Sequence, residues 1–194
     1  MTDLLDDENV FDVYPQLAIL TPLIQLASNV QWFRAVGDRL NEDTLSLAKD
    51  YCDGLGYPDA TPALLGLWGE AADAVETLDY NSPAWETEEQ LRTSLTQQAL
   101  EQIEEDILEF VFTHIANEVL PAATQGAEEV ADFLRIDDLE FVQAAAGAAV
   151  QAVHQAALVL LVGEDENHPF AVRFHIFEQG HWPLGIVGNS FNIF

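Results

Sequence analysis

The strongest structural constraint in the sequence is the spacing of apolar residues in its last stretch, residues 168–194. Apolar side chains occupy every second position in two consecutive runs: Phe170, Val172, Phe174 and Ile176, then Trp182, Leu184 and Ile186. Because successive side chains of a strand point to opposite faces, this spacing predicts two strands with one buried face. A three-residue loop at 178–180 keeps both runs on that face, whereas a two-residue loop would split them.

A third strand is predicted after the two-residue turn Gly188-Asn189, which would pair Ile186 with Phe191 and Leu184 with Ile193. The sequence therefore predicts a C-terminal three-stranded antiparallel β-meander, about residues 169–194, with strands at about 170–177, 181–187 and 190–194. The side chains expected to be buried in it are Phe174, Ile176, Trp182, Leu184, Ile186 and Phe191.

The rest of the chain, about residues 15–163, has the spacing of a helical bundle. Thr21-Pro22, Thr61-Pro62 and Ser82-Pro83 each place a capping hydroxyl before a proline at the first helical position. Apolar residues then recur every three or four positions, as on the buried face of a helix. About six helices are expected: 22–40, 41–56 with Asn41 as its cap, 62–78, 83–120, 128–135 and 138–162.

The fold expected is one mostly helical domain over residues 1–194, closed by the meander. The 49% of apolar residues suffices for a core, and no linker or repeat divides the chain. The apolar run 144–163 is about long enough to span a membrane, but Gln151, His154 and Gln155 near its middle favour a buried helix. The acidic start and the single Cys52, which lies on an apolar helix face, are typical of a cytoplasmic protein without a disulfide.

Net charge is the outlier of the composition, at −28 from 34 acidic and 6 basic residues. Arg173 and Glu178 are the only charged side chains of residues 168–194, so the excess lies in the helical part. A field of this sign repels nucleic acid and anionic membranes. It favours a basic protein partner, or a salt-rich environment that screens the repulsion, as in a halophile-adapted protein.

Four glutamates crowd the outer side of the predicted helix 83–120: Glu101, Glu104, Glu105 and Glu109. In one helix, Glu101 with Glu105 and Glu105 with Glu109 place like charges one turn apart, each pair costing a few tenths of a kcal/mol. Several such unfavourable pairs in one helix indicate that screening ions or a cationic partner offset the repulsion. We therefore expect these four residues to bind a basic protein partner.

Histidines form a second candidate site, because the meander register places His175 and His181 as diagonal neighbours on its outer face. His168, or the acidic residues at 164–166, would complete a divalent-metal site. This pattern supports an alternative function as a metal-binding protein or metal-dependent enzyme. The alternative without a metal is an exposed polar face on which His and Arg offset nearby carboxylates.

The chain has no Gly-x-Ser-x-Gly elbow for nucleophilic catalysis and no phosphate-binding loop. Neither long helix carries the Glu-x-x-His pair of a di-iron site. We therefore predict no catalytic residue and no cofactor beyond that possible metal. The first expectation is a non-enzymatic, acidic protein–protein interaction module. The uncharged strand 190–194 would leave an open sheet edge, which predicts a homodimer through the C-terminal sheet.

Overall fold

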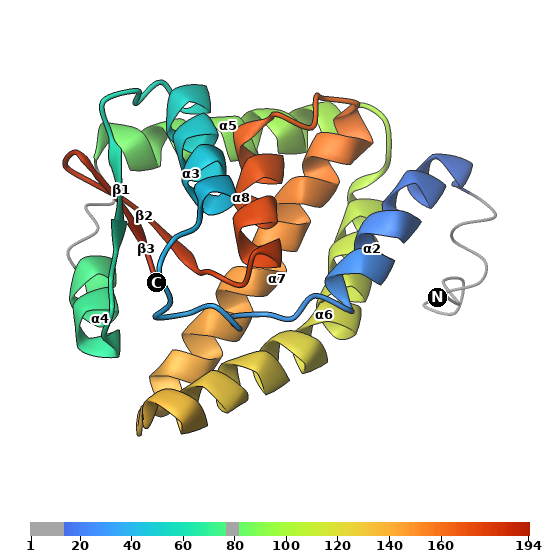
Figure 1. The fold of residues 1–194 in the computed structure, drawn as a ribbon. Coiled ribbons are helices and arrows are strands. Elements are labelled where there is room, and N and C mark those ends of the chain that lie inside the picture. The colour runs from blue at the N-terminus through green and yellow to red at the C-terminus, as the bar shows by residue number, and fades with distance from the viewer. Residues whose placement is uncertain (1–13, 77–81) are drawn as a thin grey trace.

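The computed structural model describes residues 14–76 and 82–194, and these are mostly helical, with one small sheet (Figure 1). The elements are, in chain order, the 3₁₀ helix η1 (Pro15–Leu20), α2 (Thr21–Ala27), α3 (Glu42–Gly54), β1 (Thr61–Leu64), α4 (Trp68–Glu76), α5 (Pro83–Leu100), α6 (Glu105–Leu134), α7 (Leu139–Val162), α8 (Pro169–Glu178), β2 (Pro183–Val187) and β3 (Ser190–Ile193). The predicted helical bundle is confirmed at this level.

α6 and α7 form an antiparallel hairpin, and α7 also packs against α5, α8 and η1 (Figure 1). This central position explains why α7 is apolar on most of its surface. By length and composition α7 is the one helix of the described residues that could cross a membrane. More than half of its apolar window is buried against the neighbouring helices, as the sequence predicts for a core helix.

The side chains of Asn41, Ser82 and Asp138 cap their helices as hydrogen-bond acceptors. The Asn41 side chain accepts from the Thr44 amide at 2.8 Å, and Ser82 Oγ accepts from the Trp85 amide at 3.3 Å. Both caps are confirmed. The cap of α7 is Asp138, which accepts from the Glu140 amide at 2.9 Å, so α7 begins one residue later than predicted.

The predicted helix 22–40 is wrong, because α2 ends at Ala27. The indole N–H of Trp32 donates to the Ala27 carbonyl at 3.1 Å, and Phe33 takes a left-handed backbone conformation with φ 63°. These turns send both aromatic rings into the core, where the Trp32 ring centroid lies 5.6 Å from that of Phe177. Burying two large rings outweighs the continuation of a surface helix.

Residues 83–134 also differ from the prediction of one helix at 83–120 and a short one at 128–135. The chain leaves α5 after Leu100 and enters α6 at Glu105, and α6 then runs past Pro121 and Gly126 to Leu134. Gly126 does not end the helix. A Cβ atom there would lie 2.6 Å from the Trp32 carbonyl oxygen, so glycine permits the close approach of residues 28–38.

Thr61-Pro62 begins a strand instead of the predicted helix 62–78. β1 is an edge strand, where proline is tolerated because its missing N–H faces away from the neighbouring strand. The helix of this region, α4, starts only at Trp68.

The largest correction concerns residues 170–177, which form helix α8 and not the first strand of a meander. His168 precedes Pro169 at the first helical position, and its Nδ1 accepts from the Phe170 amide at 3.2 Å. α8 packs on both α3 and α7, so buried side chains surround it and the helical spacing is obscured. Phe174 and Ile176 are buried as predicted, but on a helix.

The sheet is mixed, with strand order β1-β3-β2. β2 and β3 pair antiparallel through the predicted Gly188-Asn189 turn, and the register Ile186 with Phe191 is confirmed. A bulge between Pro183 and Gly185 removes the predicted Leu184–Ile193 pair. β1 pairs parallel with β3 on its other side. β3 therefore has no open edge, and the homodimer stays a prediction without that edge to support it.

Candidate functional site

The four glutamates predicted to bind a partner are all exposed and lie where α5 passes into α6. Glu101 and Glu104 belong to the turn between the helices, Glu105 starts α6, and Glu109 lies one turn further on. Glu105 is in the first helical turn, where the helix dipole favours negative charge. Only Glu105 and Glu109 form the like-charge pair within one helix that the sequence predicts. The Glu101–Glu105 pair is not one, because the helix breaks between them.

A second exposed acidic group follows α7: Glu164, Asp165 and Glu166. Gly163, which takes φ 74°, caps the C-terminus of α7, and Asp165 then shapes the turn into α8. Its carboxylate accepts from the Asn167 amide at 2.8 Å, and its carbonyl accepts from the His168 amide at 2.9 Å.

The two acidic groups lie at the same end of the α6–α7 hairpin (Figure 1). His154 Nε2 lies 2.9 Å from the Phe112 carbonyl oxygen, which fixes the antiparallel register of the two helices. The start of α6 lies two turns before Phe112, and the end of α7 lies two turns after His154. Because the helices are antiparallel, both of these helix ends lie on the same side of the contact. We call the seven residues the acidic end: Glu101, Glu104, Glu105, Glu109, Glu164, Asp165 and Glu166.

Basic residues are scarce around the acidic end. Between Arg92 and Arg173 the sequence holds one Lys or Arg, Arg135. Arg135 follows α6 at the opposite end of the hairpin, where its left-handed backbone conformation ends the helix. The carboxylates of the acidic end are therefore not neutralised by the helices that carry them.

An apolar groove of about 550 Å³ adjoins Glu164, Asp165 and Glu166. Three helices line it with the following residues: Pro22, Leu23 and Leu26 of α2, Ala156, Val159 and Leu160 of α7, and Ala171, Phe174 and His175 of α8. A hollow of about 700 Å³ between residues 28–38 and α6 has a mixed lining, in which apolar side chains such as Trp32 and Phe133 lie among amide side chains and the charged Arg34, Asp38 and Glu129. The first groove thus combines an apolar wall with an acidic rim.

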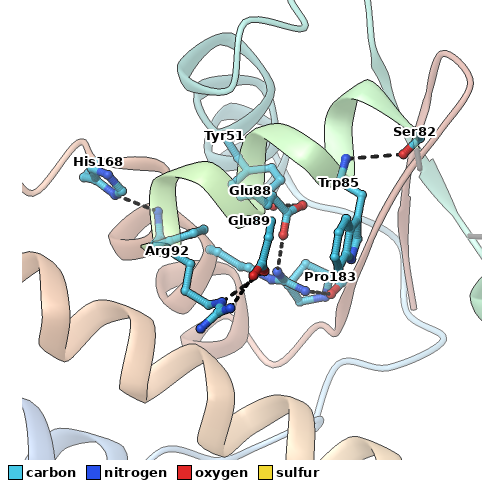
Figure 2. A network of polar contacts seen from close by, with 10 residues as sticks. Tyr51, Ser82, Trp85, Glu88, Glu89, Arg92, His168 and Pro183 are labelled. Atoms are coloured by element: carbon cyan, nitrogen blue, oxygen red, sulfur yellow. Dashed lines mark hydrogen bonds and ion pairs between the residues drawn. The ribbon is translucent and has the colours of Figure 1, made fainter. Parts of the chain in front are cut away.

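A polar network joins α3, α5 and α8 beneath the surface (Figure 2). The Tyr51 hydroxyl donates to Glu88 Oε1 at 2.6 Å, and Arg173 Nη1 donates to Glu88 Oε2 at 3.0 Å. Arg173 also donates to the Pro183 carbonyl at 3.4 Å, which ties α8 to β2. Burial, and then the Glu88 carboxylate, raise the pKa of Tyr51 well above its ordinary value. With its phenol protonated and its partners satisfied, the network holds helices together and offers no reactive group.

The predicted histidine site lacks its geometric basis, since His175 lies in α8 and His181 follows that helix instead of facing it across a sheet. His168 caps α8, and His175 contacts the Glu178 carboxylate, whose hydrogen bond raises the pKa of His175. Burial lowers the pKa of His168 and of His181. Over residues 14–76 and 82–194, no three His, Cys, Asp or Glu side chains gather as metal ligands would. Divalent-metal binding stays a prediction.

Cys52 is buried on the inner face of α3, as predicted. Burial, and then the neighbouring Asp53 carboxylate, raise the pKa of its thiol to about 11. The thiol is therefore protonated at neutral pH and is a packing group, because only the thiolate is nucleophilic.

Sequence reasoning found the exposed glutamates at 101–109 but missed that residues 164–166 lie at the same end of the α6–α7 hairpin, where a groove opens between helices. Part of this arrangement can be inferred from the sequence. The apolar spacing of α6 and α7 identifies two helices, and two helices joined by a short loop pack antiparallel. Comparison of the chain with family models, curated proteins and solved structures gives no match in any of the three.

Proposed function

We propose that this protein is an acidic binding module that holds a basic protein partner at its acidic end. The observation that carries the proposal is the meeting of two acidic groups, more than fifty residues apart in the chain, at one end of the α6–α7 hairpin. All seven carboxylates are exposed, and no Lys or Arg of α6 or α7 lies among them.

The physical basis is the summed field of these charges. A single exposed ion pair contributes about 0–1 kcal/mol, but several carboxylates on one surface attract a cationic partner together. Such a field accelerates association at low salt and fixes the orientation of the partner. The partner must then present a cluster of Lys or Arg, and its binding must weaken as salt rises.

The test is the binding of a fluorescent Lys/Arg-rich peptide, measured by anisotropy over a salt series. The acidic end is altered in the variant E101Q/E104Q/E109Q, which retains Glu105 because that residue stabilises the first turn of α6. The control variant E128Q/D132N/D137N removes three exposed carboxylates at the opposite end of the hairpin, so both variants change the net charge equally.

At about 0.1 M salt we expect the acidic-end variant to bind about tenfold more weakly and to depend less on salt, with the control within about twofold of the wild type. An equal loss in both variants would show that net charge alone attracts the peptide, which is what halophilic acidity without a binding site produces. Absence of binding by the wild type at low salt would refute the proposal.

A further inference from the structure

The groove beside the acidic end is apolar where it is deep and charged only along its rim. Phe174 and Val159 are almost fully buried in its wall, whereas Leu26 of α2 remains 45% exposed. A half-exposed leucine in the groove lining leaves apolar surface in contact with water, and covering such surface is favourable.

Apart from His175, the charged side chains around the groove are negative. Glu164, Asp165 and Glu166 line one side, and His175 is the only basic side chain in the lining. His175 already contacts Glu178 of its own helix. Arg173 of α8 donates to Glu88 in the buried network and does not line the groove.

We propose that this groove receives the apolar face of a cationic amphipathic helix from the partner, while the basic face of that helix meets the acidic rim. The inference rests on the proposed function and names the kind of segment that is bound. An amphipathic helix has apolar anchors at positions i, i+3, i+4 and i+7 and can insert them between the three groove helices. Its Lys and Arg residues then lie against the carboxylates.

The charge pattern decides between occupants. An anionic or neutral apolar segment would leave the three carboxylates of the rim beside a dehydrated interface, with only His168 near Glu164 and His175 near Glu166 to offset them, which is unfavourable. A second copy of this chain carries the same excess of negative charge and would bring like charges together. A cationic helix satisfies both parts of the groove, the apolar wall and the acidic rim.

The experiment compares two synthetic peptides of identical composition, one with Leu and Lys placed so that an amphipathic helix forms, and one with the same residues scrambled. The protein variant is Leu26→Gln, which makes the groove wall polar without changing its charge. The matched control is Leu45→Gln on α3, because Leu45 is also a half-exposed helical leucine, at 40%.

We expect Leu26→Gln to weaken binding of the amphipathic peptide about tenfold, since an anchoring apolar contact is lost. It should leave the scrambled peptide unaffected, and Leu45→Gln should affect neither peptide. The variant E101Q/E104Q/E109Q should weaken both peptides, because their charge is the same.

Equal affinities for the two peptides, with no effect of Leu26→Gln, would overturn the groove proposal and leave the acidic-end function standing. Failure of both peptides to bind the wild type would overturn both. If light scattering gives a lower molecular mass for Leu26→Gln than for the wild type, a second copy of the chain occupies the groove. That result would also overturn the groove proposal.

Discussion

Two neighbouring glutamates on α5 show at the level of single residues how burial sets the contribution of an ion pair. Glu88 pairs with Arg173 where the side chains are 18% and 14% exposed, and it also accepts the Tyr51 hydroxyl. Glu89 pairs with Arg92 one turn along the same helix, where the side chains are 37% and 43% exposed. The first pair is largely shielded from water, whereas water screens the second pair.

We expect Glu88→Ala to lower the free energy of unfolding by about 3 kcal/mol, because it leaves the Arg173 charge buried without a partner. Glu89→Ala, at the adjacent position of the same helix, should lower it by less than about 1 kcal/mol. Urea unfolding of the two variants checks this. Equal losses would show that the Arg173 site is hydrated.

His181 should make the protein less stable in mild acid. It is 1% exposed, its Nδ1 has no hydrogen-bond partner, and burial lowers its pKa below the ordinary value despite the opposing charge of Asp38. Since the unfolded chain then takes up the proton first, the contribution of His181 is present above about pH 6.5 and is lost as the pH falls through the folded pKa. Other histidines also titrate there, so a variant is needed to isolate it.

When the pH falls from about 7.5 to 5.5, we expect the free energy of unfolding of the wild type to decrease by up to about 1 kcal/mol more than that of His181→Gln. The limit is set by the single proton that the unfolded chain takes up at His181 over that interval. Unfolding curves at both pH values measure the difference. Parallel losses in the two proteins would mean that His181 stays accessible to protons in the folded state.

At the level of elements, α8 shows what a sequence pattern cannot decide. Phe170, Phe174 and Phe177 are spaced as on one face of a helix, but Val172 and Ile176 complete an equally good alternation for a strand. Both patterns fit because α8 is buried on most sides, so no polar face reveals its period. The local signal that favours a helix is His168 before Pro169, a cap followed by a proline at the first helical position.

β1 was missed for a different reason, because its partner is distant in the chain. Thr61 pairs with Ser190 in a parallel ladder, and nothing within residues 61–64 specifies that partner. In contrast, the hairpin of β2 and β3 is local and its turn residues determine it, which is why the register of Ile186 with Phe191 could be predicted. The candidate site divides in the same way. The exposure of Glu101 is a local property, whereas its position at the same end of the hairpin as residues 164–166 depends on how α6 packs on α7.

Two helical glycines should respond in opposite directions to alanine. At Gly126 of α6 the added Cβ atom would lie 2.6 Å from the Trp32 carbonyl oxygen, whereas at Gly147 of α7 nothing lies within 4 Å. Alanine is favoured over glycine by about 1 kcal/mol within a helix. We expect Gly147→Ala to raise the midpoint of thermal unfolding and Gly126→Ala to lower it.

The comparison has an internal control, because the helix propensity term is the same at both positions. If Gly126→Ala also stabilises the protein, the contact between α6 and residues 28–38 is looser than the structure describes. Circular dichroism at increasing temperature is sufficient to detect either sign.

For the whole molecule, a net charge of −28 on 194 residues means that folding brings mutually repelling carboxylates together. Salt screens that repulsion, over about 10 Å at 0.1 M. We expect the thermal midpoint to rise between about 0.1 M and molar NaCl. A midpoint independent of NaCl would show that the carboxylates do not repel enough in the folded state to affect stability.

The claim that one surface holds a cationic amphipathic segment is tested most directly by amide hydrogen exchange of the full chain, with and without the amphipathic peptide. The account predicts slower exchange in α2, at the start of α6 and in residues 159–166, together, with α3 and β2 unchanged. Slower exchange confined to α3 or the sheet, or no change at a peptide concentration that saturates binding, would contradict it.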